Sequence, residues 1–105
     1  MKLLTVISGT ADTGKSLVAE AIAREKGWPI VARDPLRASF RAQVDEEIIT
    51  TGMAALVESL LHSGLSVITV SWNQLPSDQQ LWLEVARRCR VPCRWIECRN
   101  YDTQQ

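Results

Sequence analysis

The sequence predicts a three-layer α/β domain in which one parallel β-sheet is flanked by helices. Segments with the pattern of buried strands alternate with amphipathic segments along nearly the whole chain. Glycines, prolines and capping residues separate these segments. Strands that alternate with helices are typical of parallel sheets with right-handed crossovers. We therefore expect a minimal βαβαβαβ arrangement.

The first strand and helix are the clearest elements of the N-terminal half. Leu3–Ser8 is a short run rich in β-branched residues, as expected of a buried strand. Apolar residues recur at helical spacing in Lys15–Lys26, and Gly27 is a natural helix end. Pro29–Arg33 is expected to form a short second strand. The pair Asp34–Pro35 then resembles a helix start, with aspartate as N-cap and proline at the first helical position.

The C-terminal half continues the alternation. Glu46–His62 has the spacing of an amphipathic helix, and Leu65–Ser71 is the clearest strand in the chain. Ser77–Arg90 is expected to be a helix that opens with a capping box of Ser77 and Gln80. Cys93–Cys98 is expected to be the final strand.

Length and composition limit the class of protein. The 105 residues fit a single domain over 1–105, and a 46% hydrophobic content is ordinary for a globular chain. No apolar run reaches the about 18 residues of a membrane span, and the first apolar run is too short for a signal peptide. We therefore expect a cytoplasmic protein that does not interact with a membrane.

Residues 9–16, GTADTGKS, fit the phosphate-binding pattern G-x-x-x-x-G-K-[ST] between a strand and a helix. Glycines let successive backbone N–H groups point at phosphate oxygens, at the positive end of a helix. Lys15 would bind the β- and γ-phosphates, and Ser16 would ligate Mg²⁺. The alternative is a glycine-rich turn that only caps the helix. The expected nucleotide-binding residues are Gly9, Thr10, Ala11, Asp12, Thr13, Gly14, Lys15, Ser16 and Leu17.

One of these positions is unfavourable. The carboxylate of Asp12 opposes phosphate binding unless it points to solvent.

The chain resembles a known family in three segments: residues 9–16, ARDPLR at 32–37, and VITVSWN at 67–73. They are similar to the P-loop kinase domain of bacteriophage-type polynucleotide 5′-hydroxyl kinases and to zeta-toxin-like AAA-type ATP-binding proteins. The resemblance implies a P-loop NTPase-type fold, with ATP and Mg²⁺ as cofactors. It also implies that Asp34 accepts the proton of the attacking hydroxyl and that Arg37 holds the substrate phosphate. From the local sequence alone, without the resemblance, Asp34 is equally well explained as a helix cap.

The chain departs from this family in two places. The third strand of the family usually ends in an acidic residue, where this chain has Ser71. The family also continues into a lid helix whose arginine contacts the ATP phosphates, and no such segment follows here. Arg94, Arg99 or an arginine from a neighbouring subunit or partner protein would have to replace it.

The charges are unevenly distributed. The 12 basic and 12 acidic residues give a net charge of zero, but six acidic and no basic residues fall in 45–86. Because the segments on either side are basic, the net charge of zero does not exclude a polyanionic acceptor. A C-terminal arginine cluster is better explained as a solvated helix end than as a phosphate contact. Trp72 is the best candidate for stacking on a base, whereas Trp82 and Trp95 fit the core.

Cys89, Cys93 and Cys98 lie close together near the C-terminus. Thiolates are good zinc ligands, but the spacings contain no C-x-x-C pair and the only histidine, His62, is distant in sequence. We therefore expect reduced, mostly buried thiols.

Three functions remain open. The first is a kinase that moves the ATP γ-phosphate to a hydroxyl, such as the 5′-hydroxyl of a nucleic acid, through Lys15, Ser16, Asp34 and Arg37. The second is a catalytically degenerate nucleotide-binding module that acts through a protein partner. The third is a kinase for a small molecule or nucleotide with a hydroxyl acceptor. A homo-oligomer is compatible with each of them.

Overall fold

The computed structural model describes residues 2–11 and 13–99. Along these residues the elements are β1 (Leu4–Ser8), α1 (Lys15–Lys26), β2 (Ile30–Ala32), α2 (Arg33–Ser39), α3 (Glu46–His62), β3 (Val67–Val70), α4 (Pro76–Cys89) and β4 (Cys93–Glu97). Within residues 2–11 and 13–99, no helix has both the length and the apolar content needed to cross a bilayer.

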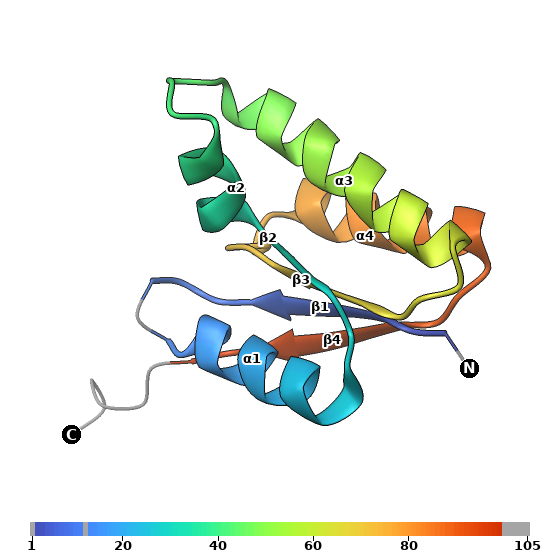
Figure 1. The fold of residues 1–105 in the computed structure, drawn as a ribbon. Helices are drawn as coiled ribbons and strands as arrows, with labels where there is room; N and C mark the ends of the chain where they lie inside the picture. The colour runs from blue at the N-terminus through green and yellow to red at the C-terminus, as the bar shows by residue number, and fades with distance from the viewer. Residues whose placement is uncertain (1, 12, 100–105) are drawn as a thin grey trace.

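The four strands form one parallel sheet in the order β2-β3-β1-β4. Figure 1 shows α1 on one face of the sheet and α3 and α4 on the other, with α2 near the ends of the strands. The three-layer α/β architecture expected from the sequence is therefore confirmed. Because all strands run in the same direction, the segments that follow β1, β2 and β3 come together at one edge of the sheet.

Two apolar clusters fill the spaces between the layers. The larger one packs α3 and α4 against the sheet and includes Met53, Val57 and Trp82, each at most 1% exposed. The smaller one lies under α1 and is built around Ile7, Ala19 and Ile68. Alternate residues of β1 point into the two clusters, so this strand is buried on both faces.

Two predicted helix caps are wrong. Helix α2 begins at Arg33 with Ala32 as N-cap, and Asp34 makes no capping bond because its carboxylate pairs with Arg37 instead. Helix α4 begins at Pro76, before the expected Ser77. The carboxylate that accepts from the backbone N–H at its start is Asp78, at 3.2 Å from Leu75 N.

Two tryptophans expected in the core differ in burial. Trp82 is fully buried, whereas Trp95 is partly buried and its Nε1 donates to Ser8 Oγ at 3.1 Å. The chain contains four tryptophans, and Trp72 is an exposed one, at 44%.

The cysteines are free thiols whose pKa values are raised by burial. Within the described part of the chain, no group of three histidine, cysteine or acidic side chains is placed to hold a metal. The fold does, however, bring His62 Nε2 to 3.7 Å from Cys89 Sγ, although the two residues are distant in sequence.

Candidate functional site

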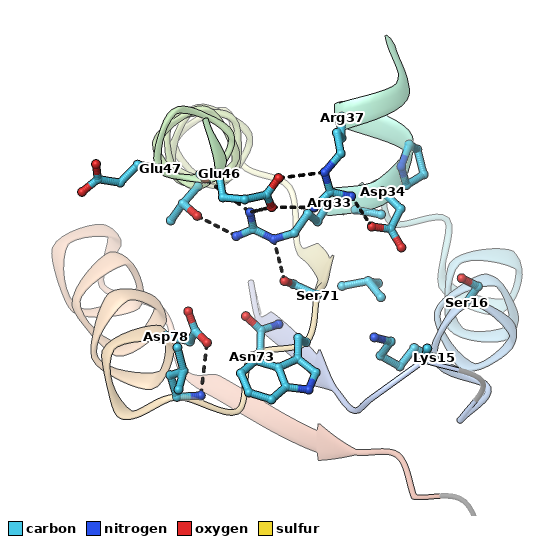
Figure 2. A pocket seen from close by; sticks show the side chains of 17 residues that line it. Lys15, Ser16, Arg33, Asp34, Arg37, Glu46, Glu47, Ser71, Asn73 and Asp78 are labelled. Carbon is cyan, nitrogen blue, oxygen red and sulfur yellow. Dashed lines mark hydrogen bonds and ion pairs between the residues drawn. The ribbon is translucent and has the colours of Figure 1, made fainter. Parts of the chain in front are cut away.

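A cavity of about 630 Å³ opens at the edge of the sheet where the strands end. The start of α1, the first part of α2, the N-terminal end of α3 and the segment after β3 contribute to its walls. Figure 2 shows Lys15 and Ser16 on one side of the cavity and Arg33, Arg37 and Glu46 on the other. In parallel α/β sheets this edge is the usual place for a ligand.

The first wall is the loop between β1 and α1. Gly9 has φ +151°, and a Cβ there would lie 2.7 Å from both the Cys98 carbonyl oxygen and Thr13 Oγ1. Its N–H donates to the Trp72 carbonyl at 3.1 Å. Gly14 has φ +83° and begins α1 as its N-cap. The loop therefore needs glycine for space at its first position and for a left-handed backbone at its sixth.

The side chain of Lys15 folds back onto the loop that precedes it. Lys15 Nζ donates to the Gly9 carbonyl at 2.6 Å, and Thr13 Oγ1 donates to the Thr10 carbonyl at 2.7 Å. Lys15, Ser16 and Ala11 line the cavity. Leu17 is 73% exposed and is not among the lining residues, and Asp12 lies outside the described residues.

The second wall is held together by Arg33, whose side chain is only 16% exposed. Its Nε donates to Ser71 Oγ at 2.9 Å, and its Nη2 donates to Thr50 Oγ1 at 2.6 Å. Its Nη1 lies 3.1 Å from Glu46 Oε1. One guanidinium thus joins the end of β2 to α3 and to the residue after β3.

Arg37 extends this network toward solvent. It donates from Nε to Glu46 Oε2 at 2.8 Å and from Nη2 to Glu46 Oε1 at 2.5 Å. Its Nη1 donates to Asp34 Oδ1 at 2.6 Å. The bonds that Arg37 makes to Glu46 and to Asp34 raise the pKa of Arg37. The bonds from Arg37, and secondarily those from Arg33, lower the pKa of Glu46 to about 2. Glu46 is therefore ionised at neutral pH.

The floor of the cavity follows β3. Ser71, at the position where the resembled family has an acidic residue, is buried and accepts the bond from Arg33. Asn73 is 3% exposed and has φ +52°. Its Nδ2 donates to the Ile7 carbonyl at 3.1 Å, and its Oδ1 accepts from Trp82 Nε1 at 3.0 Å. Asn73 thus connects the floor of the site to β1 and to the larger core cluster.

The four side chains singled out from the sequence for catalysis and metal binding, Lys15, Ser16, Asp34 and Arg37, all line this one cavity. Sequence reasoning missed the roles of Arg33 and Glu46. Arg33 precedes Asp34 in the segment that carries the family resemblance, but Glu46 looked like an ordinary acidic residue in a first helical turn. Arg94 and Arg99 are not among the residues that line the cavity.

Several solved structures share this fold. A putative kinase from Chloroflexus aurantiacus aligns with a TM-score of 0.81 and 19% identity, over 92% of this chain and 59% of that one. The APS kinase CysC of Mycobacterium tuberculosis aligns with a TM-score of 0.77 and 20% identity, over 92% and 75%. A chain of the Pnkp1/Rnl/Hen1 complex aligns with a TM-score of 0.82 and 22% identity, over 94% and 36%.

The chain therefore spans between about a third and three quarters of the length of these structures. No curated protein matches it in sequence. The sequence family described as AAA domain, however, matches residues 4–104, which is almost the whole chain. The chain belongs to this AAA domain family, with the fold of P-loop kinases.

Proposed function

We propose that the chain binds ATP at the P-loop, residues 9–16, and transfers its γ-phosphate to a hydroxyl group of an acceptor. The observation that carries this proposal is that the loop lysine, a carboxylate and an arginine line one cavity. Lys15 approaches from one wall and Asp34 and Arg37 from the other. Phosphoryl transfer needs this combination, because its catalysis rests mainly on positioning and on neutralising charge.

The loop supports nucleotide binding by its conformation. Lys15 Nζ lies on a carbonyl oxygen of the loop, so its charge already faces the space in which phosphate oxygens would replace that partner. Ser16 lines the cavity at the start of α1, which fits a hydroxyl ligand of Mg²⁺. When bound, Mg²⁺ would neutralise part of the phosphate charge.

Asp34 is the candidate general base. The acceptor hydroxyl would give its proton to this carboxylate while its oxygen bonds to the γ-phosphorus and ADP leaves. The carboxylate is 86% exposed, and the 2.6 Å bond from Arg37 Nη1 holds it in one direction. Asp34 caps no helix and lines the cavity, so its exposed carboxylate can meet a substrate there while it is paired with Arg37.

Two classes of hydroxyl acceptor are candidates for the phosphate. The resemblance to polynucleotide kinases and the likeness to a chain of an RNA repair complex support the 5′-hydroxyl of a nucleic acid. Likeness to an APS kinase and to a sugar kinase supports a small hydroxyl acceptor instead. A cytoplasmic location fits the free thiols.

One observation favours a second candidate, a degenerate nucleotide-binding module that acts through a protein partner. Ser71 offers no carboxylate at the end of β3, and its hydroxyl is engaged by Arg33. In that case ATP would bind without transfer. A partner protein or a second copy that supplies an arginine would restore transfer.

The test is γ-labelled ATP incubated with Mg²⁺ and a panel of acceptors: a 5′-hydroxyl oligonucleotide, adenosine 5′-phosphosulfate and sugars. We expect label transfer to one of them, with a loss of about 10²–10⁴-fold in Asp34→Asn. Lys15→Ala should lose about 10²–10³-fold. Glu25→Gln, on the far end of α1, is the control and should leave the rate unchanged. ATP binding without transfer to any acceptor would overturn the kinase proposal and support the module.

A further inference from the structure

The side chain of Trp72 is far more exposed to solvent than those of the two residues beside it in the chain. The side chain is 44% exposed and lines the cavity, whereas Ser71 and Asn73 on either side are 7% and 3% exposed. A large aromatic surface held open to water inside a cavity with many charged groups contributes little to folding. Because ligand pockets are lined mainly by hydrophobic and aromatic side chains, an aromatic surface in this position is available to a ligand.

The backbone at Trp72 is fixed on both sides. Its carbonyl accepts from Gly9 N at 3.1 Å, and Ser71 N donates to the Ile7 carbonyl at 3.3 Å. On the other side, Asn73 is bonded to β1 and to the buried Trp82. The indole therefore projects from a rigid base and has only two side-chain torsions to restrict, so a partner that binds it loses little conformational entropy.

The other groups of the cavity show what such a partner would carry. Trp72 shares the cavity with Asp34, the candidate base, and with two arginines. A flat ring can stack on an indole, whereas an aliphatic alcohol or a sugar without a ring base has no π-face to offer. An acceptor held at the indole would present its hydroxyl group to the same cavity that Asp34 lines.

We propose that Trp72 is the specificity-determining residue for the acceptor, and that it stacks on a planar heteroaromatic ring of the nucleobase kind. This inference rests on the proposed function, because it names the acceptor of that same site. The ring belongs to the acceptor and not to ATP. In the proposed function ATP is held through its phosphates by residues 9–16, whereas Trp72 shares the cavity with Asp34, the candidate base for the acceptor hydroxyl.

The experiment compares two acceptors that differ only in the ring: a short 5′-hydroxyl oligonucleotide and the same oligonucleotide with an abasic 5′-terminal residue. Stacking of one base predicts a preference of roughly 10- to 100-fold for the base-bearing acceptor, expressed mainly in KM. Trp72→Ala should reduce this preference to near one, and Trp72→Phe should keep most of it. The KM for ATP should not change in either variant.

Phe40→Ala is the matched control, because Phe40 is also an exposed aromatic, at 42%, but does not line the cavity. It should leave the preference intact. The proposal is overturned if Trp72→Ala keeps the preference, or if it raises the KM for ATP and leaves the acceptor KM unchanged.

A binding experiment tests ring stacking at Trp72 separately from phosphate transfer. If the wild-type chain transfers no phosphate, the same two oligonucleotides are compared by fluorescence anisotropy. Tighter binding of the base-bearing form, lost in Trp72→Ala, would support ring stacking in a protein that is not a kinase. Equal binding of the two forms would overturn it.

Discussion

The two walls of the cavity are built by different means. The P-loop wall, residues 9–16, is one continuous segment whose shape comes from glycine conformations and backbone hydrogen bonds. The arginine wall consists of Arg33, Asp34, Arg37 and Glu46, held by side-chain bonds that reach Thr50 and Ser71. It therefore combines groups from α2, α3 and the end of β3.

This difference determines what each wall responds to. Backbone conformation is insensitive to ionic strength, so the P-loop wall should fail only when its space or its torsion angles are altered. Exposed ion pairs weaken with salt and with protonation of their carboxylates. Substitutions, salt and pH should therefore affect the stability of the two walls differently.

The largest expected effect is on the P-loop wall. In Gly9→Ala the new Cβ would meet the Cys98 backbone carbonyl at 2.7 Å, so the loop must move. Crowding of about 1–3 kcal/mol would add to backbone strain of about 1–2 kcal/mol. In Gly27→Ala, where φ is +75° and no atom lies within 4 Å, only the strain applies. Urea unfolding and ATP titration would measure both, and equal losses in the two variants would show that contact with Cys98 does not matter.

An intermediate effect is expected from the buried part of the arginine wall. Arg33→Ala leaves the hydroxyls of Thr50 and Ser71 without their donor, which should lower the free energy of unfolding by about 1–3 kcal/mol. Arg37→Ala removes a more exposed ion pair and should cost about 0–1 kcal/mol. Thermal or urea unfolding would rank the two variants, and a larger loss in Arg37→Ala would contradict a stabilising role for the buried Arg33 side chain.

The smallest effect is a pH dependence. The pKa of Glu46 falls from 4.5 to about 2 in the folded chain, so the folded state favours the ionised carboxylate. Its stabilising contribution should be complete above pH 4.5 and should disappear as the pH falls toward 2. The difference in melting temperature between wild type and Glu46→Gln should therefore shrink over this window, and also in high salt. Glu47→Gln, at the next position of α3, is the control, and a difference that stays constant down to pH 2 would exclude the ion pair as its source.

The two walls also differ in how far the sequence predicts them. Local signals were sufficient for the P-loop and for the bounds of α1 and α3, because glycine, lysine and the apolar spacing act within a few residues. The arginine wall depends on contacts across the fold. Arg33 meets Ser71, 38 positions away, and no local pattern encodes that pairing.

The wrong prediction at Asp34 has a local physical cause. An aspartate before a proline favours an N-cap, but an arginine three residues later on the same helix competes for the carboxylate. The sequence singled out Asn73 only as part of the segment 67–73, which resembles the kinase family. Its left-handed backbone and its two buried bonds depend on where β1 and α4 lie, which the sequence around it does not specify.

The central position of β1 has a consequence for how the protein is made. This strand pairs with β3 on one side and with β4 on the other, and Gly9 is pressed against Cys98 just beyond β4. Both of the strands that hold the P-loop in shape follow it in the chain, so they are synthesised after it. Long-range parallel pairing of this kind is slow. The phosphate-binding loop is therefore completed only after β4 has been synthesised, and nascent chains that stop before β4 should not retain ATP.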